Sequence, residues 1–206
     1  MKIELNSRRI AVLISGRGSN FKAIAKQIDQ GILDAEIVLV LSNKESAAGL
    51  EEARRRGLKA AYLPSAGLKR DEYDSRVVAL LEENDVALVC LAGFMRILSP
   101  VFVKAFPLRI LNIHPSLLPA FPGLEAQRQA LEHGVKFSGC TVHFVDESLD
   151  GGPIVRQVMV PVLDGDTVED LSDRILSQEH RLYSEAIGKV LDGRCEIHDR
   201  RVVIDG

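Results

Sequence analysis

The sequence contains no tryptophan, and only three tyrosines and seven phenylalanines occur among its 206 residues. Proteins that bind single-stranded nucleic acid stack the bases on aromatic side chains, so this scarcity argues against that class. Acidic and basic residues nearly balance, with 29 Asp and Glu against 26 Lys and Arg. A protein that binds nucleic acid through its phosphates has a basic excess or a basic stripe. We therefore expect no nucleic-acid partner.

Cysteines are also few, and Cys90, Cys140 and Cys195 lie far apart in the sequence. A disulfide framework uses an even number of cysteines, so these three fit a reducing compartment. They form no closely spaced pair, and the histidines form no H-x-x-x-H pattern, so the spacing typical of a zinc site is missing. We expect no metal site.

Long apolar runs are missing as well. The longest, around residues 87–95, is well short of the roughly 18–20 residues that span a bilayer. Near the N-terminus, Glu4, Arg8 and Arg9 precede an apolar run of only five residues, 10–14. A signal peptide has a longer apolar stretch directly after its basic residues. We expect a cytoplasmic protein that makes no membrane contact.

The chain is instead rich in short, nearly continuous runs of valine, isoleucine and leucine, which are typical of strands buried on both faces of a parallel sheet. Such runs occupy residues 9–15, 36–42, 59–63, 86–92 and 108–113. Between them, apolar residues recur at helical spacing in residues 20–30, 46–56 and 71–84. This alternation predicts an α/β fold with a Rossmann-like, doubly wound, mostly parallel sheet.

The pattern changes in the second half of the chain. Residues 138–145 and 154–160 predict two strands, and the turn-rich loop between them indicates an antiparallel pair. Residues 167–191 predict the longest helix, with Thr167 and Asp170 spaced as a capping box. Residues 196–204 predict a small hairpin. Since no repeat or linker interrupts the sequence, we expect residues 1–206 to form a single domain with antiparallel additions to its sheet.

A glycine-rich segment, Ser-Gly-Arg-Gly-Ser-Asn-Phe at residues 15–21, follows the first predicted strand. Glycines let the backbone approach an anion, and the first N–H groups of a helix point toward it. A dinucleotide site needs a third glycine where this chain has Phe21, and an acidic residue where it has Ser42-Asn43-Lys44. Two alternatives remain: a site for one phosphate, with donors from Ser19 and Asn20, and a plain strand-to-helix turn with Asn20 as the N-cap.

Asn112 and His114 end the last predicted parallel strand. Residues two apart on a strand point to the same side, so both can project into the crevice at the carboxyl ends of the strands. Asparagine supplies a neutral donor, and histidine can act as acid, base or cationic donor near neutral pH. Asp150 lies in the sequence Leu-Asp-Gly-Gly-Pro, where it forms either a simple turn or a partner that favours the charged form of His114. For His114 itself, the alternative is a packing or capping role.

Together these motifs resemble the folate-dependent formyltransferases, and among them the phosphoribosylglycinamide formyltransferases, also called glycinamide ribonucleotide transformylases. The resemblance covers essentially the whole chain. It is carried by VLISGRGSN, LSNK, LAGFMRILSP, LNIHPSLLP, LDGGP and QEH, at residues 12–20, 41–44, 91–100, 111–119, 149–153 and 178–180, and by residues 142–146.

The resemblance implies transfer of the formyl group of 10-formyltetrahydrofolate, a co-substrate, to the amine of N1-(5-phospho-β-D-ribosyl)glycinamide in purine (IMP) biosynthesis. The amine would attack the formyl carbon directly, without a covalent enzyme intermediate and without a metal. Asn112 and a protonated His114 would donate to the oxyanion that forms. Asp150 would keep His114 charged and orient it.

The resemblance also implies two binding regions. The N-terminal half would hold the substrate phosphate, and the C-terminal half would hold the folate and carry the catalytic loop. Glycinamide ribonucleotide would contact Gly18, Ser19, Asn20 and Glu179; the folate would contact Arg70, Met95, Arg96, Ile97, Leu98 and Asn112, under the loop at 145–149. Without the family, residues 95–98 would be interpreted as core, and Arg70 and Glu179 as solvated helix charges. The resemblance is also compatible with a homodimer.

Two other functions remain open, a deformylase and a noncatalytic regulator, whereas a methionyl-tRNA formyltransferase is disfavoured. A formyltetrahydrofolate deformylase shares the Asn, His and Asp but uses water as the acceptor; members of that family usually carry an N-terminal regulatory domain and lack proline after the histidine. A methionyl-tRNA formyltransferase would need a C-terminal RNA-binding domain. A noncatalytic regulator that binds folate or nucleotide would have no need to keep all three polar residues.

Overall fold

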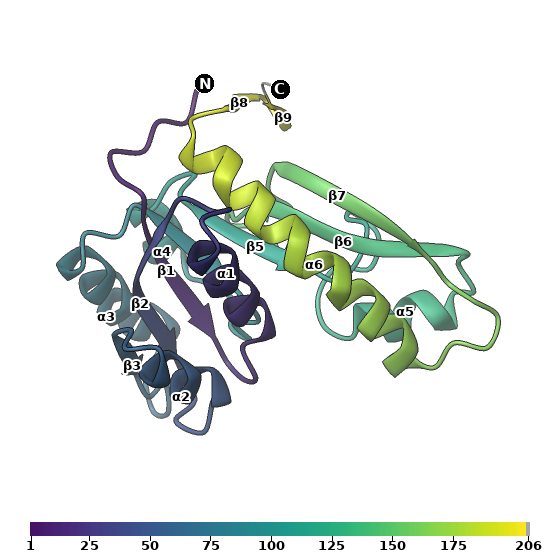
Figure 1. Ribbon diagram of the computed structural model, residues 1–206, viewed down its shortest axis with the longest axis horizontal. Helices are drawn as coiled ribbons and strands as arrows, with labels where there is room; N and C mark the ends of the chain where they lie inside the picture. The colour runs from purple at the N-terminus through teal and green to yellow at the C-terminus, as the bar shows by residue number, and fades with distance from the viewer. Residues whose placement is uncertain (205–206) are drawn as a thin grey trace.

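The computed structural model of the protein describes residues 1–204, so the last two residues of the expected domain 1–206 lie outside it. The strands are β1 Arg9–Ile14, β2 Glu36–Ser42, β3 Ala60–Tyr62, β4 Leu88–Leu91, β5 Ile110–His114, β6 Phe137–Phe144, β7 Ile154–Pro161, β8 Cys195–His198 and β9 Arg201–Ile204. The helices are α1 Ser19–Asp29, α2 Ala48–Arg55, α3 Arg70–Glu83, α4 Pro100–Ala105, α5 Ala126–Glu132 and α6 Val168–Leu191. The strands form one sheet in the order β3-β2-β1-β4-β5-β6-β7-β9-β8 (Figure 1).

The N-terminal half is a parallel sheet with helices on both faces. Strands β3, β2, β1, β4 and β5 pair in parallel. Along β1, Ile10, Val12 and Ile14 pack on one side with residues of α1, α2 and α6, whereas Ala11 and Leu13 pack on the other with residues of α3 and α4. Each strand is therefore buried on both faces, which is why these runs are apolar without alternation. The predicted doubly wound α/β fold is confirmed.

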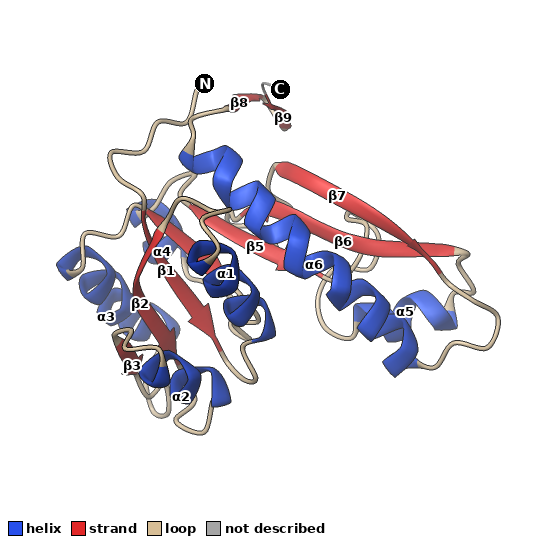
Figure 2. Cartoon of the chain, viewed as in Figure 1, coloured by secondary structure: helices blue, strands red, loops and turns tan. Residues whose placement is uncertain are grey.

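The sheet changes direction at β5, which pairs in parallel with β4 on one side and antiparallel with β6 on the other. Strand β7 continues the antiparallel part, and the long helix α6 crosses one face of it (Figure 2). In the β5–β6 register, Asn112 lies opposite His143 and His114 lies opposite Thr141. The antiparallel additions predicted for the second half are thus present, and they bring β6 against the polar end of β5.

Two short helices, α4 and α5, have no counterpart in the predicted elements. They are 6 and 7 residues long, too short for an apolar periodicity to be recognised. The other elements agree with the prediction to within about two residues at each end, and the capping box of α6 is formed by Thr167 and Asp170. Within residues 1–204, no helix combines the length and apolar character needed to cross a bilayer.

One buried hydroxyl links α6 to the centre of the sheet. Tyr183 is fully buried, and its OH lies 3.0 Å from the carbonyl oxygen of Leu91 and 2.9 Å from that of Leu111. Burial raises the pKa of Tyr183 well above its ordinary value, so the hydroxyl remains a donor. This contact fixes α6 against the ends of β4 and β5, next to Asn112.

Replacement Tyr183→Phe removes this donor and leaves the buried carbonyls with less hydrogen bonding. We expect the free energy of unfolding to fall by roughly 1–2 kcal/mol, measured by urea denaturation. The matched control is Tyr62→Phe, since the side chain of Tyr62 is exposed and the change should stay within about 0.5 kcal/mol. Equal stabilities of the two variants would contradict the bridging role.

Candidate active site

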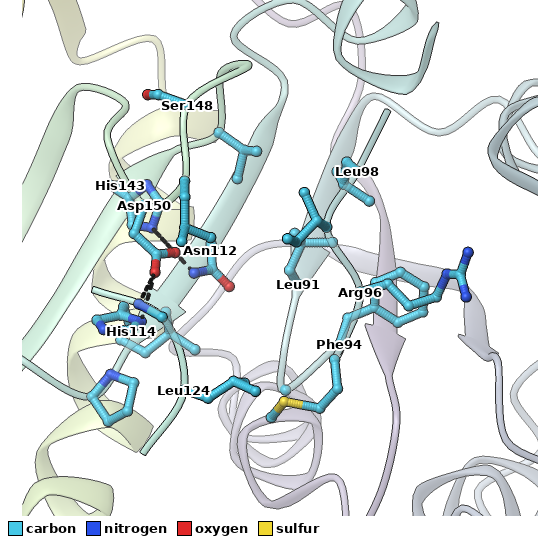
Figure 3. Close-up of a pocket in the computed structure, with 18 of the residues that line it drawn as sticks. Leu91, Phe94, Arg96, Leu98, Asn112, His114, Leu124, His143, Ser148 and Asp150 are labelled. Carbon is cyan, nitrogen blue, oxygen red and sulfur yellow. Dashed lines mark hydrogen bonds and ion pairs between the residues drawn. The ribbon is translucent and has the colours of Figure 1, made fainter. Parts of the chain in front are cut away.

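A cavity of about 660 Å³ opens at the carboxyl ends of β4 and β5. Its remaining walls come from three loops, around residues 93–98, 123–127 and 145–150. Asn112, His114, His143 and Asp150 lie together on one wall, and Leu91, Phe94 and Leu98 lie on the opposite side (Figure 3). The cavity therefore has one polar wall and one largely apolar wall, as sites for small organic ligands commonly do.

The polar wall is built around the carboxylate of Asp150. Its Oδ2 lies 3.5 Å from Nδ1 of His114, and its Oδ1 lies 3.8 Å from Nε2 of His143. Oδ2 also accepts a hydrogen bond of 2.8 Å from the backbone N–H of Gly123. The side chains of His114, His143 and Asp150 are only 6%, 2% and 13% exposed, so these contacts are weakly screened by water. The expected contact between Asp150 and His114 is present.

Gly152, two residues after Asp150, is needed to place the Asp150 carboxylate beside the two histidines. Asp150 has a left-handed backbone, with φ of 49°. A Cβ on Gly152 would lie 1.9 Å from the carbonyl oxygen of Phe144, which no side chain could tolerate. Gly152 thus lets the loop pass directly over the end of β6, and this passage brings Asp150 back to the histidines.

The ring of His114 has an acceptor at each nitrogen. Nδ1 faces Asp150, and Nε2 lies 2.9 Å from the carbonyl oxygen of Phe121. Only a ring that carries protons on both nitrogens can donate to both groups. Both ring nitrogens of His114 therefore face oxygen atoms that can accept a hydrogen bond.

His143 is arranged for the neutral form. Burial lowers its pKa, and the attraction of Asp150 opposes this shift without cancelling it. Nδ1 lies 2.9 Å from the carbonyl oxygen of Phe144 and can donate to it, and Nε2 lies 3.1 Å from Nδ2 of Asn112 and can accept from it. His143 therefore orients the Asn112 amide and leaves one of its two N–H groups free to face the cavity.

Sequence reasoning found no function for His143. The apolar pattern around His143 predicted a strand, and a strand must pair with a neighbouring strand. Only the register of β6 against β5 shows that His143 lies opposite Asn112. By contrast, Asn112 and His114 both line the cavity, as expected from their spacing on one strand.

A second, smaller pocket of about 380 Å³ lies at the glycine-rich segment and is lined by residues 15–20. Gly18, with φ of 69°, is the N-cap of α1, and no side chain of the described residues caps the helix. Asn20 is therefore not the N-cap but lies in the first turn, where its Nδ2 donates to Oε2 of Glu179 at 2.7 Å. Burial raises the pKa of Glu179, which lines the same pocket. Gly18, Ser19, Asn20 and Glu179 are thus brought together.

Most of the predicted folate-binding residues line the large cavity, but one of them does not. Met95, Arg96, Ile97 and Leu98 line the large cavity, and Met95 and Ile97 are 62% and 60% exposed, so they are not core residues. The guanidinium of Arg96 points away from Asp150 and the histidines (Figure 3). Arg70 lines neither pocket; it is exposed at the first turn of α3.

Comparisons with known proteins agree with the geometry. A family model described as formyl transferase matches residues 8–187. Phosphoribosylglycinamide formyltransferase of Escherichia coli (strain K12) is 44% identical over 96% of this chain and 93% of its own length. The structure of glycinamide ribonucleotide transformylase 1 from Symbiobacterium toebii superimposes with a TM-score of 0.94 and 54% identity, covering 96% of this chain and 94% of that one.

The trifunctional purine biosynthetic protein adenosine-3 of Gallus gallus is 48% identical over 95% of this chain. The chain spans only 20% of that protein's length. The matched region is therefore one part of a larger polypeptide in the chicken relative.

The two histidines should be distinguishable by NMR. In a titration of protein labelled with ¹⁵N-histidine, we expect His143 to titrate below its ordinary value of 6.5 because its burial penalises the charged form. Its ¹⁵N shifts should show the proton on Nδ1, the nitrogen that faces the Phe144 carbonyl. The variant His143→Gln assigns the resonance, and a pKa of 6.5 or higher would contradict this assignment of roles.

Proposed function

The chain belongs to the formyl transferase family, and we propose that it transfers the formyl group of 10-formyltetrahydrofolate to the amine of N1-(5-phospho-β-D-ribosyl)glycinamide in purine biosynthesis. One observation carries this proposal: the two pockets adjoin, sharing Gly93, Met95, Ile113, Pro115 and Gln127 as lining residues. A pocket suited to a phosphate therefore opens directly beside a cavity suited to a flat organic molecule, with the polar wall nearby. An enzyme that joins two substrates needs this arrangement.

The polar wall suits attack of a neutral amine on the formyl carbon. As the new C–N bond forms, the formyl oxygen gains negative charge. Asn112, through its free N–H, and the imidazolium of His114 donate to it, and such stabilisation contributes about 2.7–4 kcal/mol per donor. Asp150 balances the charge of His114 and fixes the ring. The tetrahedral intermediate then loses the folate nitrogen, which takes up the proton released by the amine, with water as the carrier.

The large cavity would hold the folate. Its volume of about 660 Å³ falls in the range of sites for ligands of that size. The exposed side chains of Met95 and Ile97 supply apolar surface, Leu98 adds to this wall, and the backbone of Arg96 offers polar groups for the pterin edge. The loop at 145–149 forms the facing wall. Arg70 lies outside the cavity wall, and its assignment to the glutamate end of the folate rests on the family resemblance alone.

The small pocket would hold the ribose phosphate. The uncapped N-terminus of α1 presents the N–H groups of Ser19 and Asn20, and its dipole favours an anion. Arg17 is the only cationic side chain among the described residues that line this pocket. Glu179 would then accept a hydrogen bond from the glycinamide part of the substrate. In the same proposal, residues 1–206 act as one formyltransferase domain in the cytoplasm, with a homodimer as a further assembly.

The direct test is an absorbance assay of tetrahydrofolate release from 10-formyltetrahydrofolate. We expect release only when glycinamide ribonucleotide is present. Release without the acceptor would identify a formyltetrahydrofolate deformylase instead. Binding without release would identify a regulator.

In the same assay, His114→Ala and Asp150→Asn should each lower kcat by at least about a hundredfold, with modest changes of KM, because each removes transition-state stabilisation. The control is His198→Ala, which removes an exposed histidine of β8. Near-wild-type turnover of either site variant would contradict the proposed roles.

Arg17→Ala should raise the KM for glycinamide ribonucleotide roughly tenfold and leave kcat at saturation nearly unchanged, because a charge-assisted contact to a phosphate is lost. The matched control is Arg54→Ala, which removes the same charge from an exposed position on α2. The wild-type KM should rise with salt more steeply than that of Arg17→Ala. Equal KM values in the two variants would exclude a specific phosphate contact.

A further inference from the structure

The cavity wall formed by residues 95–98 is held from behind by helix α3. Asp74 of α3 is fully buried, and its Oδ2 accepts a hydrogen bond of 2.6 Å from the backbone N–H of Ser99. Tyr73, also fully buried, lies under Arg96, whose guanidinium carbon is 4.2 Å from the centroid of the tyrosine ring. Tyr73 and Asp74 do not line the cavity, so they touch it only through this segment.

Within the segment only Leu98 packs into the core, so two of its apolar side chains do not anchor it. Met95 and Ile97 face the cavity and are more than half exposed. At its N-terminal end, the backbone is instead tied to Ser15, the residue after β1, whose Oγ accepts from the N–H of Met95 at 2.8 Å. At its C-terminal end, the corresponding bond is the one from Ser99 to Asp74. Two polar contacts therefore hold the two ends.

The contact between α3 and the segment is unusually polar for a buried contact. Four buried side-chain atoms, two from α3 and two from Arg96 and Ser99, have no hydrogen-bond partner in the part of the chain that the structure describes: Tyr73 OH, Asp74 Oδ1, Arg96 Nε and Ser99 Oγ. Burying such groups without a partner lowers the free energy of unfolding, and an apolar residue at position 74 would avoid this loss. The helix thus gives up stability at the place where it contacts the segment.

We propose that Asp74 and Tyr73 are positioning residues for the folate. Asp74 fixes the backbone at Ser99, and Tyr73 holds the Arg96 side chain away from the cavity, so that the backbone of residues 95–98 faces the pterin ring. The inference rests on the proposed function, because it assigns these two residues to the folate side of that same site.

The test separates the two substrates kinetically. Asp74→Ala should raise the KM for 10-formyltetrahydrofolate about tenfold, as expected for the loss of a buried bond to a charged group. The KM for glycinamide ribonucleotide and kcat should stay within about threefold of wild type. Asp74→Asn, which keeps an acceptor for the Ser99 N–H, should restore most of the folate affinity. Tyr73→Leu should resemble Asp74→Ala, and Tyr73→Phe, which keeps the ring, should resemble wild type.

The matched control is Glu82→Gln, which removes a carboxylate from an exposed position of the same helix. Calorimetric titration with tetrahydrofolate gives the folate affinity independently of turnover, and thermal melting shows whether each variant is folded. If Asp74→Ala does not fold, the comparison of Tyr73→Leu with Tyr73→Phe decides the proposal.

Unchanged folate affinity in folded Asp74→Ala, or in Tyr73→Leu, would overturn the positioning role. Parallel losses in kcat and in the KM for both substrates would overturn it as well, because they indicate a general structural defect. Failure of the proposed function looks different: wild type and Glu82→Gln would then both lack acceptor-dependent transfer, whereas the calorimetric comparison would still report whether α3 shapes a folate site.

Discussion

The contact of the Asp150 carboxylate with two imidazoles is the interaction on which the site depends. His114 and His143 face opposite oxygens of this carboxylate, and all three side chains are nearly inaccessible to water. The two rings differ in their neighbours: His114 has acceptors at both nitrogens, whereas Nε2 of His143 accepts from Asn112. Asp150 thus faces His114, while His143 orients the amide donor of Asn112, two residues before His114 on the same strand. This pairing is what an oxyanion hole for formyl transfer requires.

The direction change at β5 makes that contact possible. Because β6 runs antiparallel to β5, His143 and Thr141 of β6 lie opposite Asn112 and His114 of β5. The loop after β6 then turns back over Phe144 at Gly152 and delivers Asp150 from outside the sheet. The proposed phosphate pocket lies at the end of β1 in the parallel half, so the two proposed substrate sites adjoin at the carboxyl ends of the strands. The antiparallel strands are thus a functional part of the fold and not an appendage to it.

Much of the fold could be predicted from local patterns. The apolar runs at β1, β2 and β4 and the long helix α6 follow directly from residue type and spacing. Asn112 and His114 could be placed on one wall because side chains two apart on a strand share a face. The short helices α4 and α5 escaped prediction because one or two turns carry no recognisable period. The roles of His143, Asp74 and Tyr73 also escaped it, since each acts across a tertiary contact.

The sequence by itself determined the class of fold and the shared face of Asn112 and His114, because each depends on the chemistry of neighbours in the chain. Only the tertiary structure decided which partners the nitrogens of each histidine face, such as the carbonyl groups of Phe121 and Phe144. It also decided that Asn20 pairs with Glu179 and does not cap its helix. The guanidinium of Arg96 likewise stacks on the ring of Tyr73 and points away from Asp150 and the histidines. Hydrogen bonds and desolvation depend on distances between residues far apart in sequence, and folding alone sets those distances.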